Sequence, residues 1–475
     1  MEASTRLQGW WNLRRDIVGP AVAVGASVAA CAVLRPLRDE QAVRFGSGIV
    51  SGLFFATFAA LVLVTVAAAL AGRRFGRQKA VNASMIAGLA ALVLILAWVG
   101  IDSDGASPAG AALVVSHGVL TVFTVAMAWQ SVADRDSASG RGRAVAAAAI
   151  GAGLGSILGP LTAAMLVAGA GSRWLVPAAA MLLGIATYSA TRQRNGRVTT
   201  GPNRARGPAG VTSGTDAGVR RVAGLVAGWS VVSTIIYFVQ VSIVGEQLSD
   251  PHARVQWFAS LDLSANAVAL LVQIGTARWT ARRTGLPAVL AIGPVLAAGG
   301  FVAIWLWPDA GVLAVVTVIG RAGGTALFRP ARELLLASVV RPVESPTRCA
   351  IDGVVYRAAD AATAASIGVL SGGAPTVGVL AAFGATAAVA LAVAGFRIGR
   401  IHDHQLHNSH YGIAPDVRED AGRQRIDPGV PGGARCLGAG LDHTDHSIDG
   451  RAAADRWPWH LADLRRRIRR ARADP

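Results

Sequence analysis

Ionisable side chains interrupt several long apolar runs of this sequence, most densely between Ile319 and Ala362. That stretch contains Arg321, Glu333 and Asp360 among residues that otherwise look apolar enough to cross a bilayer. A charged side chain at the bilayer centre costs about 2.5 to 3.5 kcal/mol, so such residues usually face a bundle interior or a water-filled path. We therefore interpret this stretch as the working part of the chain.

The candidate path residues are ionisable or hydrogen-bonding, and they lie in or beside apolar runs. They are Arg35, Arg38, Asp39, Gln240, Asp262, Asn266, Gln273, Arg321, Arg329, Arg332, Glu333, Asp352, Tyr356, Arg357 and Asp360. Guanidinium groups match the geometry of carboxylates and phosphates. The surplus of arginine over lysine in these runs therefore favours a small anionic solute as the binding partner.

Two arrangements of these residues follow from helical spacing. Asp262, Asn266 and Gln273 fall within about 40° of one another at 100° per residue, which predicts a polar stripe on one helix face. The stripe either lines a path or forms interhelical hydrogen bonds of about 0.6 kcal/mol each, and the charge of Asp262 favours the path. We also expect Arg321 and Asp360 to pair at similar depth, either as a structural ion pair or as one that a charged substrate breaks.

The pattern Arg-Pro-x-Arg-acid occurs at 35–39, where it is expected to end a first span, and again at 329–333. Arg332 is predicted to share a helix face with Arg321, and Pro330 is predicted to kink its helix. Inverted repeats relate such positions on opposite membrane sides, where two arginine clusters could attract an anion from either side. An interfacial kink with basic anchors is the alternative.

The composition indicates that the helices carrying these residues lie in a membrane. Of 475 residues, 53% are hydrophobic and 15% charged, and the mean hydropathy is +0.46, which excludes an ordinary soluble protein. Twelve apolar runs are long enough to span a bilayer. The predicted spans are 17–34, 46–72, 80–101, 110–130, 144–168, 174–191, 222–245, 258–277, 286–307, 311–338, 350–371 and 375–396. The sequence thus predicts an all-α protein with two six-helix halves, 17–191 and 222–396, joined by a polar linker, 192–221.

Loop charges predict the orientation. The net charge of +17 comes mainly from arginines in short loops, including those at 73–77, 192–197 and 278–283, whereas Asp102 and Asp309 lie in alternate loops. This positive-inside pattern predicts a multi-pass protein of the bacterial inner membrane with both termini cytoplasmic. The N-terminus, 1–16, and a tail, 397–475, would then be cytoplasmic, the polar tail poorly ordered.

Other classes of function find little support. The sequence has no phosphate-binding loop of the G-x-x-x-x-G-K-[ST] type and no H-E-x-x-H signature, so we expect neither an enzyme nor a cofactor. Cys31, Cys349 and Cys436 have no metal-ligand spacing, and we expect no metal site. Aromatic residues do not alternate with basic ones, so we expect no nucleic-acid partner. The oligomeric state is left open, and a monomer is compatible with the sequence.

Three stretches together resemble the bacterial branch of the ATP:ADP antiporter family, the nucleotide translocase-like group of the major facilitator superfamily. They are LRPLRD at 34–39, FRPARE at 328–333 and AIDGVVYRAAD at 350–360, and GAGLGSILGP at 151–160 adds to the likeness. The resemblance covers roughly residues 17–396. It implies twelve helices in two halves, a central cavity and alternating access, with nucleotide as the default solute.

The chain also departs from that group. The best-known members exchange ATP for ADP with lysine and glutamate residues in the membrane, whereas Lys79 is the only lysine here and lies in a loop. Gln240 and Asp360 stand where the resemblance implies a glutamate and a lysine. We therefore expect a secondary transporter of an anionic solute. The alternatives are a transporter of a non-nucleotide solute and a non-transporting membrane scaffold or sensor with the tail as its output.

Overall fold

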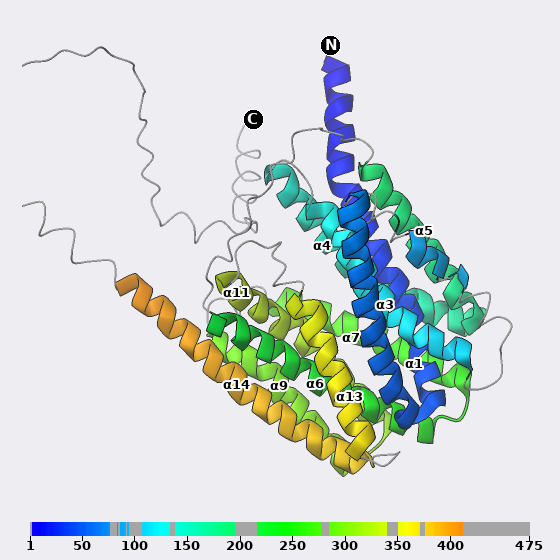
Figure 1. Cartoon of the computed structure of the whole chain (residues 1–475), viewed down its shortest axis with the longest axis vertical. Helices are drawn as coiled ribbons and strands as arrows, with labels where there is room; N and C mark the ends of the chain where they lie inside the picture. The colour runs from blue at the N-terminus through cyan, green and yellow to red at the C-terminus, as the bar shows by residue number, and fades with distance from the viewer. Residues whose placement is uncertain are drawn as a thin grey trace, which may run out of the picture. The chain divides into compact units, whose positions relative to one another are not determined.

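The computed structural model describes residues 2–76, 83, 86–91, 93–94, 107–133, 138–194, 216–276, 285–339, 350–370 and 376–411, with side chains described from residue 17 onward. Nearly all of these residues are helical (Figure 1). The N-terminal half contains α1 (Glu2–Phe75), α3 (Pro108–Ala133), α4 (Ala138–Gly169), a short 3-10 turn (Ser172–Trp174) and α5 (Leu175–Arg194). Helices α3, α4 and α5 all pack against α1.

The C-terminal half starts with α6 and includes two π-helical segments. Its elements are α6 (Asp216–Gln247), α7 (Pro251–Thr276), α9 (Leu286–Leu306), α10 (Ala310–Gly323), the π segment Gly324–Phe328, α11 (Arg329–Val339), the π segment Ala350–Val355, α13 (Tyr356–Leu370) and α14 (Val377–Tyr411). Helix α14 packs along α9 and α6 (Figure 1). The largest core cluster lies mainly among these helices, around Phe238, Phe301 and Leu290, and it also includes Ala42, Val43 and Val50 of α1.

Helix α1 contains the first two predicted spans, which join at Gly46. This glycine has φ 71° and ψ 167°, a backbone conformation that side chains with a Cβ rarely adopt. The first span therefore continues to Phe45, and its predicted end at Leu34 is wrong. Residues 35–39 lie inside a helix, because their charges find partners within the protein instead of needing water at the membrane surface.

The described helices confirm an all-α membrane fold. Nine of them are long and apolar enough to cross a membrane, and the first holds two spans on either side of Gly46. The π segment Ala350–Val355 and α13 together cover the eleventh predicted span. Most of the predicted third span and the middle of the predicted linker lie outside the described residues. Helix α14 continues to Tyr411, so the predicted tail begins as helix; residues 412–475 are outside the description.

The glycine-rich stretch at 151–160 brings α4 against the first span of α1. A Cβ on Gly155 would lie 2.2 Å from the carbonyl oxygen of Gly25, and one on Gly151 would lie 2.1 Å from that of Ala21. Only glycine allows the two backbones to approach this closely. The structure therefore gives this stretch a packing role.

Contacts between the two halves gather toward one end of the helices. Ser51 meets Gly368, and Phe54 packs on Tyr237 and Phe238. A ring nitrogen of His252 lies 3.0 Å from the carbonyl oxygen of Val167, and Val43 touches Gly245. Among the described residues, these contacts lie near the turns at 46, 170–171 and 248–250. In a twelve-span chain these turns follow odd-numbered spans, so they share one membrane side.

Candidate functional site

Three charged residues of the Arg-Pro-x-Arg-acid motif face the C-terminal half from α1. Arg38 donates from Nε to Asp39 Oδ1 at 2.8 Å, and its guanidinium carbon lies 5.2 Å from the centre of the Tyr237 ring on α6. Arg35, one turn earlier, places Nη1 3.6 Å from Asp262 Oδ1 on α7. The motif thus links the two halves through both an ion pair and a cation–π contact.

Asp262 is held between two guanidinium groups. Its Oδ1 accepts from Arg321 of α10 as well as lying near Arg35, and the carboxylate is 1% exposed. One negative charge is therefore shared by arginines of opposite halves, which offsets part of the cost of burying each charge. The other oxygen, Oδ2, is buried with no hydrogen-bond partner in the described part of the chain.

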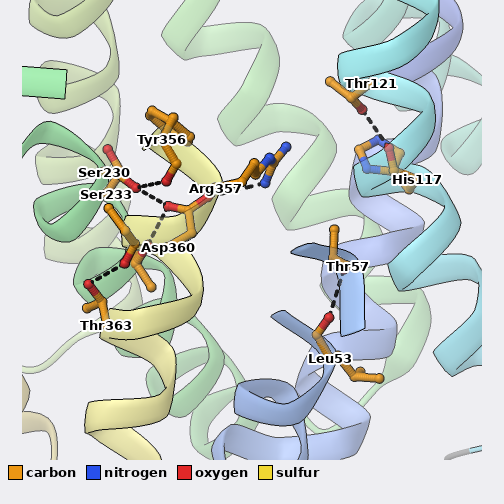
Figure 2. Close-up of polar contacts among 12 residues, drawn as sticks. Leu53, Thr57, His117, Thr121, Ser230, Ser233, Tyr356, Arg357, Asp360 and Thr363 are labelled. Carbon is orange, nitrogen blue, oxygen red and sulfur yellow. Dashed lines mark hydrogen bonds and ion pairs between the residues drawn. The ribbon is translucent and has the colours of Figure 1, made fainter. Parts of the chain in front are cut away.

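Asp360 forms a second centre where α13 meets α6 (Figure 2). Its Oδ1 accepts from the hydroxyls of Ser230 and Thr234, the latter at 2.8 Å, and its Oδ2 accepts from Arg357 Nη1 at 3.2 Å. The Ser230 hydroxyl also lies 2.8 Å from the carbonyl oxygen of Tyr356, so its single hydrogen is shared between these two acceptors. Because both oxygens have donors, the buried carboxylate is well satisfied as an anion.

A small cavity joins this centre to the N-terminal half. Arg357 extends from α13 toward the helices that carry Thr57 and His117 (Figure 2). The cavity has a volume of about 30 Å³ and is lined by Arg38, Phe54, Thr57, Val114, Gly118, Tyr237, Arg357 and Asp360. Water fits in this volume, whereas organic ligands usually occupy about 300 to 1,000 Å³. The two halves therefore lie close together around Arg38 and Arg357 in this conformation.

Gln240 extends the polar surface along α6. It lies one turn beyond Tyr237, is 1% exposed, and donates from Nε2 to Thr317 Oγ1 at 2.9 Å. Thr317 is in turn one helical turn before Arg321 on α10. The polar contacts therefore run from α1 through α6 and α10 to α7 and back to α1.

The cluster carries a small positive excess. Its four guanidinium groups and three carboxylates leave one positive charge, and they come from both halves. They are Arg35, Arg38, Asp39, Asp262, Arg321, Arg357 and Asp360. Such an arrangement can attract an anion, and the arginine–carboxylate pairs can exchange partners with it.

The expected pair of Arg321 with Asp360 is wrong. Arg321 pairs with Asp262, and Asp360 pairs with Arg357. Similar depth in the membrane does not decide which helices are neighbours: α10 packs against α7, and α13 packs against α6. The prediction that Arg321 and Arg332 share a helix face assumed a regular rotation of 100° per residue. The π segment Gly324–Phe328 lies between them and interrupts that rotation.

Other predicted site residues are not among the seven charged residues of this cluster. Gln273 is exposed and donates to the carbonyl oxygen of Thr325 at 3.4 Å, while Asn266 is half-buried on the same helix. Arg329 is exposed, and Arg332 pairs with Glu333 at 2.5 Å. The side chain of Asp352 is outside the description. The second Arg-Pro-x-Arg-acid motif thus repeats the local Arg–acid pairing of the first on a different helix.

Several residues of the site were not predicted from the sequence, notably Ser230, Thr234 and Tyr237. They recur on α6 at spacings of four and three residues, so with Gln240 they form a polar stripe that helical periodicity could have revealed. His117 of α3 was also missed. It is buried, and its Nε2 lies 2.9 Å from the carbonyl oxygen of Cys31.

Fold and site together define a class of protein. The chain is a multi-pass membrane protein with the major facilitator type of fold, and its charged residues meet where the two halves of that fold join. Transporters of known structure have this architecture. The chain is similar to a peptide transporter of the POT group in complex with sulfate, with a TM-score of 0.56 and 14% identity over 82% of this chain and 94% of that one.

Other solved structures agree on the fold. A nucleoside transporter, NupG, has a TM-score of 0.52 and 13% identity, covering 80% of this chain and 99% of its own. A D-xylose-proton symporter has a TM-score of 0.52 and 11% identity, covering 80% and 96%. No protein-family model and no curated protein matches the chain. The resemblance to the nucleotide translocase-like group therefore stays a prediction.

Proposed function

We propose that this protein is a secondary transporter that carries a small anionic solute across the membrane by alternating access. One observation carries the proposal: Arg38 and Arg357, from opposite halves, face the same cavity together with Asp360. An anion entering there can replace Asp360 as the partner of Arg357, and it can bridge the two guanidinium groups. Solute binding would then be coupled to how the halves pack.

The arrangement of interhalf contacts supports an alternating mechanism. The described contacts between halves lie toward the side of the turns at 46 and 248–250, where Ser51 meets Gly368. From the basic loops we propose that this side faces away from the cytoplasm. We propose that the structure represents the conformation closed to the outside, with both termini in the cytoplasm of a bacterial cell.

Transport by the purified protein in vesicles tests the proposal. Wild-type protein is expected to take up at least one labelled anion from a panel of nucleotides, sugar phosphates and carboxylates. The variants Arg38→Gln and Arg357→Gln should each reduce uptake at least about tenfold, because each removes a charge that contacts the solute. Arg74→Gln is the matched control, since Arg74 is exposed near the end of α1. Uptake of neutral or cationic solutes only would contradict the proposal.

The resemblance supplies the finer proposal that the anion is a nucleotide. The arginine-rich cluster suits a phosphate, but Gln240 and Asp360 replace the residues that the ATP:ADP antiporters use. Vesicles loaded with ADP and supplied with labelled ATP distinguish exchange from net uptake. No exchange, together with uptake of another anion, would exclude the nucleotide while keeping the transporter.

A non-transporting scaffold or sensor is the second candidate function. In this case the C-terminal tail, 397–475, would pass the signal to other molecules. Removing residues 412–475 leaves every described helix intact. A transporter should retain most of its uptake after this truncation, whereas a sensor should lose its function. We propose that the chain catalyses no chemical reaction. Hydrolysis of any solute of the transport panel by the purified protein would contradict this part of the proposal.

A further inference from the structure

Three buried acceptor atoms in or beside the charged cluster have no donor among the described residues. They are Oδ2 of Asp39, Oδ2 of Asp262 and Oε1 of Gln240, and each of these residues is 1% exposed. Buried polar atoms are normally hydrogen-bonded, so three unmatched acceptors in one region call for an explanation.

The acceptors of Asp262 and Gln240 belong to one connected site. The partner of Asp262 is Arg321, and the partner of Gln240 is Thr317, which precedes Arg321 by one helical turn on α10. Tyr237, one turn before Gln240, contacts Arg38 of the proposed anion cavity. The acceptors are therefore linked to the anion cavity through Tyr237 and α10, although neither side chain lines the cavity in this conformation.

The positive charge of the neighbouring arginines limits which chemical groups can act as donors to these acceptors. Asp262 already lies between Arg35 and Arg321, and the cluster has an excess of positive charge, so a metal cation or an ammonium group is disfavoured. Neutral O–H and N–H groups add no charge. Water can supply such donors when no solute is bound, and a solute hydroxyl can replace it.

We propose that the solute is an organic anion that also carries hydroxyl or N–H groups, with its anionic group between Arg38 and Arg357 and its donors on Asp262 and Gln240. This inference rests on the proposed function and specifies its substrate class. A site with buried acceptors rejects an analogue that lacks the matching donors, because the acceptors are then left without partners. Specificity would therefore depend on hydroxylation as well as on charge.

Matched anions test the inference with the full-length protein in detergent. Glycerol 3-phosphate and propyl phosphate share a chain length and a phosphate, but only the first has hydroxyls; gluconate and hexanoate are the corresponding carboxylates. Kd is measured by calorimetry for all four. In one pair or both, the hydroxylated member should bind at least about tenfold more tightly, as expected for one unmet hydrogen bond.

Gln240→Leu should reduce that preference to about threefold or less while the non-hydroxylated anion binds as before. Gln256→Leu, at an exposed position of α7, should leave the preference unchanged. Equal affinity within both pairs for the wild-type protein would overturn the inference and leave anion transport standing. Binding of none of the four anions would instead count against the proposed function. A preference that survives in Gln240→Leu would overturn the role of Gln240.

Discussion

At the scale of single residues, the site depends on which carboxylate neutralises which arginine. Asp262 and Asp360 have the same charge and are both buried, yet Asp262 is shared by Arg35 and Arg321, while Asp360 accepts from two hydroxyls and Arg357. Breaking a buried ion pair leaves an uncompensated charge and costs about 3 to 5 kcal/mol. A solute that supplies a substitute charge avoids this cost, which makes the pairs suitable for transient opening.

Asp360→Asn tests this account. Asparagine keeps a carbonyl oxygen for Ser230 and Thr234 but removes the charge opposite Arg357. We expect uptake to fall at least about tenfold, while the amount of protein in the membrane stays within about twofold of wild type. Asp250→Asn is the control, because Asp250 is exposed and accepts from backbone N–H groups at the start of α7. Normal transport by Asp360→Asn would contradict a role for this carboxylate.

At the scale of elements, glycine positions determine how closely helices approach. Along α4, Gly151 and Gly155 face backbone atoms of α1, whereas Gly153 has open space around its Cα. At the start of the π segment, a Cβ on Gly324 would lie 2.3 Å from the Trp229 ring, which also stacks on Phe328 at 4.6 Å. The π segment that follows α10 is therefore packed directly against α6.

Gly155→Ala and Gly153→Ala form a matched pair on one helix. The added methyl at 155 would overlap the carbonyl oxygen of Gly25, so α1 and α4 must separate. We expect this to cost about 1 to 3 kcal/mol of stability, the usual range for overpacking. Alanine at 153 meets nothing and should be neutral or slightly stabilising. Thermal unfolding of the purified proteins checks this, and equal Tm values would show that the close approach is not required.

At the scale of the whole molecule, the contacts between halves form a band on one membrane side. In the described residues this band includes the Ser51–Gly368 and Val167–His252 contacts. The band combines small residues and single hydrogen bonds with the packing of Phe54 on Tyr237 and Phe238. Opening it would separate Ala42, Val43 and Val50 of α1 from the largest core cluster, so the opening exposes apolar surface.

A crosslink between Ser51→Cys and Gly368→Cys tests whether the band must open. A Cβ on Gly368 would lie 3.3 Å from the Cβ of Ser51, close to the 3.5 to 4.5 Å of natural disulfides. With the native cysteines replaced, oxidation should reduce transport at least about tenfold, and a reductant should restore it. Each single cysteine serves as a control. Full transport by the oxidised pair would show that the band stays closed throughout the cycle.

The sequence by itself determined the membrane class, most of the described spans and most of the residues in the charged cluster. Apolar runs of about 20 residues need a bilayer, and charges within them need internal partners, so both facts can be read locally. The same local reasoning identified Arg35, Arg38, Asp262, Arg321 and Asp360 as members of one site.

Only the tertiary structure decided how these residues are paired. The pairing of Arg321 with Asp262 depends on α10 lying beside α7, and the burial of the Gln240 and Asp262 acceptors depends on four helices meeting. Helix neighbours are set by packing between residues far apart in the chain, which helical periodicity does not contain. The end of the first span was missed for a related reason: partners on other helices allowed its charges to remain within α1.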